Sequence, residues 1–171
     1  MSSVESSAVP TSEPTPSTPP PPPPLHARPR KIRVIAFVLA PVVVLVMSVI
    51  ATSLHGKTGD GPGYFQRGDS LAMVGLGIIG GLAVLLLARP RVEGDLTGVR
   101  VRNIFGSYEL SWDDVRAVTY GRGAPWVTLS LHNDDVMAIM AIQAADKAYA
   151  VKATRHLRAL YAAHQELGAA A

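Results

Sequence analysis

Two long apolar segments without charged residues dominate the first half of the chain. No Asp, Glu, Lys or Arg occurs in residues 34–56 or in residues 71–88. A membrane-spanning helix needs about 20 mostly apolar residues, within a range of about 17 to 25. The pattern therefore predicts a transmembrane hairpin over residues 32–88, with spans at 32–54 and 71–88 joined by an external loop at 55–70.

Basic residues flank this hairpin asymmetrically. The loop carries only Lys57 and Arg67, whereas six basic residues lie outside the pair of spans: Arg28, Arg30, Lys31, Arg33, Arg89 and Arg91. Lys and Arg concentrate in cytoplasmic flanks, so these six predict the topology. We expect a multi-pass protein of the inner or plasma membrane with cytoplasmic N- and C-termini. A cleaved signal peptide is the alternative for the first span, but its apolar core would be only about 7–15 residues long.

Small residues in the second span indicate a close helix contact. Gly77 and Gly81 are four residues apart and therefore share one helix face. We interpret them as packing residues between the two helices of the hairpin, and homo-oligomer formation through the same glycines is the alternative.

The segment before the hairpin has no apolar periodicity. Residues 1–31 are rich in Ser, Thr and Pro and include the run Pro19 to Pro24. Such a segment buries too little apolar surface to offset the entropy of ordering, so we expect a disordered, proline-rich cytosolic tail. The proline run predicts a stiff extended spacer, or a ligand for an aromatic-lined groove.

From Val92 the pattern changes to short segments in which apolar and polar positions alternate, which is typical of strands. Gly106, Asp113-Asp114 and Asn133-Asp134-Asp135 supply turn residues between them. The expected strands are 98–105, 108–112, 115–120, 126–132 and 136–142, with a bent initial strand at 92–96.

The last segment has helical periodicity. Apolar residues recur at spacings of three and four across residues 145–167, with Asp146 as a first-turn or capping carboxylate and Gly168 as the end. The fold class is therefore α+β: the hairpin, then a domain at 92–167 with a small antiparallel β-barrel or sheet capped by a C-terminal helix.

Several pieces of this domain together resemble the bacterial PH-like domains. They are Gly98-Val-Arg-Val-Arg-Asn-Ile-Phe, Ser111-Trp112-Asp113-Asp114-Val115, Ala124-Pro125-Trp126 and Ala141-Ile142-Gln143-Ala144. More narrowly, the arrangement is similar to the membrane-anchored low-molecular-weight protein antigen 6 family. The resemblance implies a partly open, helix-capped barrel in which Trp112 and Trp126 are packing residues, and it implies no catalytic residues.

Arginines on the predicted strands are the candidate binding residues. Arg100 and Arg102 share a strand face, and Arg116 could join them to form a contact for anions or lipid headgroups. The alternative is solvated strand faces, because residues 92–171 contain eight Lys and Arg against nine Asp and Glu, a net charge of −1. The same balance argues against a nucleic-acid partner.

No catalytic, cofactor-binding or metal-binding constellation is visible in the sequence. His132-Asn133-Asp134-Asp135 places an imidazole near two carboxylates, but a turn explains these residues and a metal site needs further ligands. We therefore expect a non-enzymatic membrane protein without a cofactor, which presents a cytosolic PH-like domain for interaction with a protein partner or for assembly. Binding of anionic lipid headgroups by that domain is the alternative.

Overall fold

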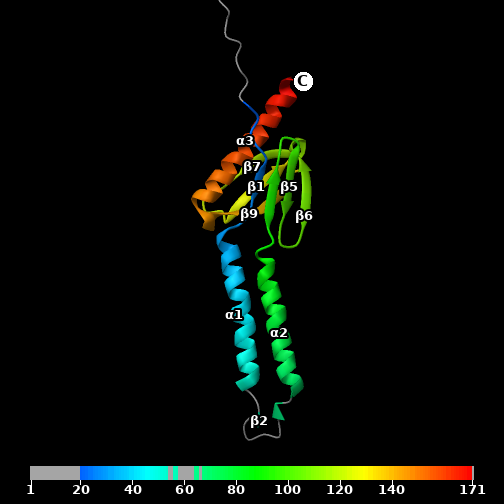
Figure 1. The fold of residues 1–171 in the computed structure, drawn as a ribbon. Coiled ribbons are helices and arrows are strands. Elements are labelled where there is room, and N and C mark those ends of the chain that lie inside the picture. Colours follow the sequence, from blue (N-terminus) through cyan, green and yellow to red (C-terminus); the bar gives the residue numbers. More distant parts are fainter. Residues whose placement is uncertain (1–19, 54–55, 58–63, 66, 171) are drawn as a thin grey trace, which may run out of the picture.

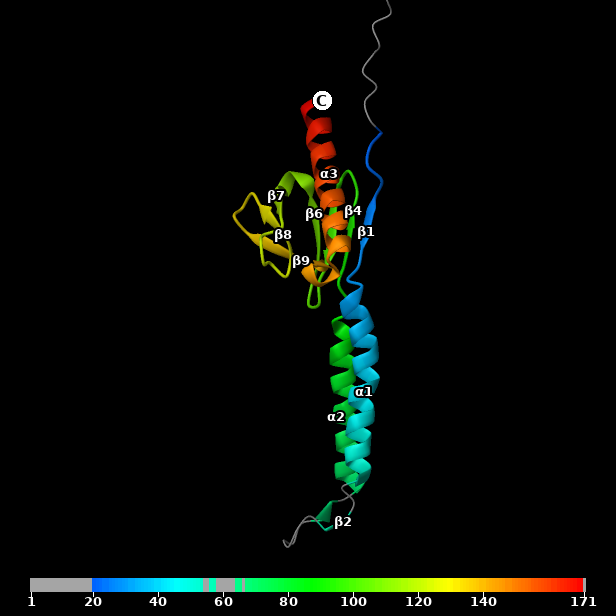
Figure 2. The same cartoon turned by 90° about the vertical axis from the view of Figure 1, so that its left-hand side faces the viewer.

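The computed structural model describes residues 20–53, 56–57, 64–65 and 67–170. Two apolar helices, α1 (Lys31–Ser53) and α2 (Arg67–Leu86), lie side by side and extend from one end of a β-rich domain (Figures 1 and 2). At the far end of the helix pair, β2 (Gly56–Lys57) pairs antiparallel with β3 (Tyr64–Phe65). The prediction of a disordered tail over residues 1–19 lies outside the described residues.

Both helices are long and apolar enough to cross a membrane. Their large side chains point outward: Leu71 is 74% exposed, Ile79 65% and Leu45 63%. The buried residues of α1 are small instead: Ala36, Ala40 and Ala51. In the contact between the helices, Ala40 lies against Gly81 of α2. The second helix begins at Arg67 and ends at Leu86, earlier at both ends than the predicted span. An acidic first turn containing Asp69 favours this earlier start.

The β-rich domain contains a four-stranded and a three-stranded antiparallel sheet. The first sheet has the order β1-β4-β5-β6 and the second the order β7-β8-β9. The strands are β1 (Leu25–Ala27), β4 (Arg91–Gly94), β5 (Gly98–Arg102), β6 (Ser107–Ser111), β7 (Val115–Thr119), β8 (Trp126–Leu131) and β9 (Val136–Gln143). The described strands of this domain form two separate sheets and no closed barrel, so that of the expected small barrel or sheet the structure shows sheets.

The sequence alternation predicts the buried faces of most strands. In β5, Val99 and Val101 are buried, and in β8 the buried residues are Val127, Leu129 and Leu131. In β7 the buried residues do not alternate strictly. The register of pairing with β8 shifts between Val115 and Ala117, so that Val115 and Val118 are buried.

Two polar side chains hold the domain together. The Asn103 side chain interrupts the apolar alternation because it bonds the backbone of β9: Nδ2 donates to Ala138 O (2.7 Å), and Oδ1 accepts from Met140 N (3.1 Å). The fully buried Trp112 donates from Nε1 to Asp95 O (2.7 Å), and its ring lies against that of Tyr161. Trp126 is half-buried. These bonds satisfy polar groups that would otherwise be costly to bury.

The C-terminal helix α3 (Ala148–Ala170) covers the core with Ala150, Ala153, Leu157 and Leu160. The prediction that Gly168 ends the helix is wrong, because Gly168 lies within α3 in open space, where no contact opposes another helical turn. The final turns extend beyond the sheets, which leaves Leu167 57% exposed (Figure 1).

The prediction of a disordered tail is also wrong for residues 25–27, near its C-terminal end. Leu25–Ala27 forms β1 and pairs with Gly94–Val92 at the edge of the first sheet (Figure 2). Leu25 and Ala27 are buried in the core, and His26 points outward. A segment that precedes α1 is therefore a structural part of the domain that follows α2.

Candidate functional site

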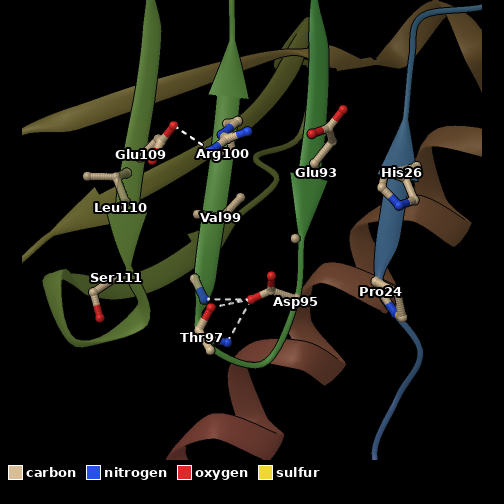
Figure 3. Close-up of a pocket in the computed structure, with 12 residues that line it drawn as sticks. Pro24, His26, Glu93, Asp95, Thr97, Val99, Arg100, Glu109, Leu110 and Ser111 are labelled. Carbon is tan, nitrogen blue, oxygen red and sulfur yellow. Dashed lines mark hydrogen bonds and ion pairs between the residues drawn. The ribbon is translucent and has the colours of Figure 1, made fainter.

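A row of charged side chains crosses the outer face of the first sheet. The strand register places His26, Glu93, Arg100 and Glu109 side by side on β1, β4, β5 and β6 (Figure 3). Arg100 Nη2 lies 2.7 Å from Glu109 Oε1. These side chains line a pocket of about 450 Å³ together with Asp95. With three carboxylates around one guanidinium, the pocket disfavours an anion.

Three hydrogen bonds to one carboxylate stabilise the β4–β5 turn at the edge of this pocket. Asp95 Oδ1 accepts hydrogen bonds from Thr97 Oγ1 (2.6 Å), Thr97 N (2.8 Å) and Gly98 N (3.1 Å). These bonds, the Thr97 hydroxyl first among them, lower the pKa of the Asp95 carboxyl below its ordinary value of 3.8. The carboxylate is thus charged at neutral pH and fixes the β4–β5 turn.

The three predicted arginines lie on both sheets. Arg100 pairs with Glu109, whereas Arg102 lies beside Arg91 in register and has a buried Nε without a hydrogen-bond partner. Arg116 lies on β7 of the second sheet and pairs with Asp134 in the β8–β9 turn. Two of the three charges are therefore already compensated, and the contact with anions or lipid headgroups stays a prediction.

The segment His132 to Asp135 forms the β8–β9 turn. Asn133 Nδ2 donates to Asp135 Oδ2 (2.7 Å), and Asp135 N donates to Asn133 Oδ1 (3.1 Å). Asp134 has a positive φ of 67° and bonds Arg116. Within residues 20–53 and the later described ranges, no group of three or more His, Cys, Asp or Glu side chains is placed to hold a metal ion.

Gly77 and Gly81 of α2 lie against α1. A Cβ at Gly77 would lie 2.7 Å from Met47 Cβ, and one at Gly81 would lie 3.0 Å from Val44 Cγ2 and 3.2 Å from Ala40 O. Both glycines are needed for this close approach, which is the arrangement that packing within the hairpin requires. Homo-oligomer formation stays a prediction.

The predicted topology residues gather at the end of the hairpin that meets the domain. Arg28, Arg30, Lys31 and Arg33 lie at the start of α1, and Arg89 and Arg91 follow α2 (Figure 1). Arg89 Nη1 donates to Ile104 O in the β5–β6 turn (3.1 Å). The six basic residues therefore lie around the junction of the apolar helices with the first sheet, and we refer to them as the collar.

Asp146 joins this collar to the domain. The prediction that it caps its own helix is wrong: it lies in the single turn η2 (Ala144–Asp146) before α3 and caps α1 instead. Its Oδ2 accepts from Arg30 N (2.9 Å) and its Oδ1 from Lys31 N (3.0 Å), although 115 residues separate Lys31 from Asp146. The carboxylate thus satisfies amides that the first turn of a helix leaves unpaired. A positive φ of 47° at Lys147 redirects the chain between η2 and α3.

Tyr149 forms the second contact of the junction. The guanidinium of Arg30 lies 4.2 Å from the centre of its ring, and Arg28 N donates to its hydroxyl (3.3 Å). A cation above an aromatic face is attracted to the ring quadrupole. Sequence reasoning missed the contact between Tyr149 and Arg30. The only signal for this junction in the sequence is Asp146, whose residue type and place before a helix are typical of a cap.

Comparisons with known proteins cover most of the chain. The family model described as Bacterial PH domain matches residues 89–160. The chain is 36% identical over 129 residues to "Uncharacterized protein Rv1417" of Mycobacterium tuberculosis, a match that covers 75% of this chain and 84% of the relative. "Uncharacterized protein Mb1452" of Mycobacterium bovis matches with the same identity and coverage. No solved structure matches the chain. The narrower likeness to the low-molecular-weight protein antigen 6 family stays a prediction.

Proposed function

This chain belongs to one family with the uncharacterized mycobacterial relatives and contains a domain of the bacterial PH domain family at residues 89–160, and we propose that it is an integral membrane protein without catalytic activity. In this proposal α1 and α2 span the inner or plasma membrane, and both termini are cytoplasmic. The PH-like domain is presented at the membrane surface for protein interaction or assembly.

The observation that carries the membrane part is the outward orientation of the large apolar side chains on both helices. Val34 is 64% exposed and Phe37 57% on α1, and Leu71 is 74% exposed on α2. A core helix of a water-soluble protein would bury such residues against its neighbours. A continuous apolar surface around two helices of spanning length instead fits the hydrocarbon core of a bilayer.

The basic collar supports the orientation. All six residues lie at the end of the hairpin that meets the PH-like domain, and Lys and Arg concentrate on the cytoplasmic side of membrane proteins. The domain and the collar thus lie on one side of the membrane in this proposal.

The edge of the first sheet supports the interaction part. Strand β6 is one of the two edge strands of the sheet, opposite β1, and Tyr108 on it is 48% exposed. An edge strand presents unpaired N–H and C=O groups, to which an extended segment of a partner can pair. The partner in this proposal is a protein with such a segment.

Carbonate extraction of cell membranes tests the membrane part. We expect the full chain to stay in the membrane pellet, and its release into the supernatant would overturn the proposal. A photo-crosslinking residue at Tyr108 tests the interaction part, with the same residue at the exposed Gly121 as the control. A specific crosslinked protein is expected from Tyr108, whereas identical crosslinks from both positions would contradict a role for β6.

A further inference from the structure

A groove of about 670 Å³ lies where the PH-like domain meets the start of α1. Its upper part is lined by Arg28, Arg30 and Arg33, and its wall on the domain side is Tyr149. Its lower part is apolar and is lined by Val34, Phe37 and Val38 of α1. The groove thus joins a cationic end to an apolar end.

The three arginines have no acidic side-chain partner in the described parts of the chain, where the ion pairs involve other residues. The carboxylate of Asp146 is close, but it is bonded by backbone N–H groups and is only 8% exposed. The amides at the start of α1 are therefore already satisfied, and the guanidinium groups are the donors that remain. Arg30 is held against the Tyr149 ring, which fixes one of these donors toward the groove.

The order of residues along α1 matches the order of groups in a phospholipid. Phe37 is one turn beyond Arg33, about 6 Å farther along the helix axis at 1.5 Å per residue. Residues four apart share a helix face, so Val34 and Val38 also follow one another on one face of α1. Phe37 is 57% exposed and Val38 61%, which leaves this apolar wall without a covering side chain.

We propose that this groove binds one anionic glycerophospholipid of the membrane, with its phosphate on Arg28, Arg30 and Arg33 and an acyl chain along Val34, Phe37 and Val38. The site rests on the proposed membrane-spanning function. It is separate from the strand arginines, because the pocket beside Arg100 is surrounded by carboxylates. A guanidinium offers paired donors to a phosphate, and basic pockets beside membrane helices suit anionic headgroups.

Native mass spectrometry of the full chain in a neutral detergent tests the site. The probes are phosphatidylglycerol and phosphatidylcholine with identical acyl chains, and glycerol 3-phosphate as the headgroup without chains. A detergent micelle has no inside and outside, so a change of membrane topology in the arginine variants cannot affect the binding measurement. We expect the wild-type chain to retain one phosphatidylglycerol in preference to phosphatidylcholine.

The Arg30→Gln, Arg33→Gln double variant should weaken phosphatidylglycerol binding by more than tenfold, since one arginine near a lipid surface contributes about fivefold. Arg89→Gln with Arg91→Gln is the matched control, because it removes two charges from the same collar outside the groove. Phe37→Ala should weaken binding by about tenfold without a change of charge.

The inference is overturned if the two double variants lose phosphatidylglycerol equally, because attraction would then depend on total charge. It is also overturned if glycerol 3-phosphate displaces the lipid at equal concentration, which would assign the site to free phosphate. Either result leaves carbonate extraction unaffected, whereas release by carbonate would remove the proposed function itself.

Discussion

Replacement of Asp146 by Ala tests whether one carboxylate couples the PH-like domain to the apolar helix α1. Asp146 Oδ2 accepts from Arg30 N at 2.9 Å and Oδ1 from Lys31 N at 3.0 Å, and the residue is 8% exposed. Loss of a helix N-cap costs about 0.5–2 kcal/mol, and a hydrogen bond to a charged group contributes about 1.5–3 kcal/mol. Because Ala also removes the cost of burying a carboxylate, we expect a net loss of about 2 kcal/mol.

This loss should be visible at the junction itself. A change of about 2 kcal/mol corresponds to an increase of about 30-fold in the population of the opened state. Hydrogen exchange of the full chain in detergent measures this population through the amides of residues 30–34. We expect their exchange to accelerate by about that factor, while the amides in the middle of α1 change little.

Two variants make the result specific. Asp146→Asn keeps one acceptor oxygen and should restore part of the protection, whereas Asp114→Ala removes an exposed carboxylate of the same domain and should have no effect at the junction. Equal acceleration at residues 30–34 in Asp146→Ala and Asp114→Ala would refute the role of Asp146 as the cap of α1.

Three further predictions concern the stability of the fold. Gly77→Ala should destabilise the helix pair by about 1–3 kcal/mol in thermal unfolding in detergent, because its Cβ would lie 2.7 Å from a neighbouring Cβ. Gly75→Ala, with no atom within 4 Å of its Cβ, is the control, and an equal loss there would contradict the packing argument. Leu25→Ala should destabilise the domain by about 2–3 kcal/mol in urea unfolding, since Leu25 is buried in the core, and an unchanged midpoint would show that β1 contributes nothing. The raised pKa of His164 stabilises the fold below about pH 6.5, and this stability is lost as pH rises through the folded value. The melting temperature should therefore fall more between pH 6 and 8 in the wild type than in His164→Gln, and parallel curves would refute the linkage.

The His164 prediction follows from the surroundings of the ring. Nε2 lies 3.0 Å from Asp113 Oδ1 and Nδ1 lies 2.9 Å from Leu96 O, so both nitrogens face acceptors. Only the protonated ring donates to both. The bond to Asp113 is the main cause of the raised pKa of His164, and it lowers the pKa of Asp113 in turn. The stability that the lowered pKa of Asp113 contributes is present above pH 3.8 and is lost as pH falls through the folded pKa of Asp113.

Local patterns were enough to predict most elements of the fold. The alternation in β8 and the uncharged runs of α1 and α2 depend on neighbours within a few residues, and that information is present in a short segment. Leu25–Ala27 is different, because three residues beside a proline run show no period. Its burial arises from pairing with β4, about 65 residues away along the chain, and from contact with the still more distant α3.

The candidate site depended still more on distant neighbours. The sequence placed Arg100 on an exposed strand face, as observed, but register decides that Glu93 and Glu109 lie on either side of it. Asp146 was identified as a capping residue from its type and place before a helix. Which helix it caps depends on the turn at Lys147, where a positive φ is not evident from the residue type.

The junction contacts together fix the orientation of the domain relative to the helix pair. On one side, β1 pairs with β4 and leads through the buried Pro29 into α1, whose first turn is capped by Asp146. On the other side, α2 passes through Pro90 into β4, and Arg89 bonds the β5–β6 turn at Ile104. Because each helix is attached by a short segment with its own hydrogen bonds, rotation of the domain would break both attachments at once. The same side of the domain, with the 90% exposed Phe105 in the β5–β6 turn, therefore stays beside the collar of basic residues. A domain fixed in this way presents β6 and the groove beside Tyr149 in constant positions relative to α1 and α2, which is what the proposed role as an assembly surface at a membrane requires.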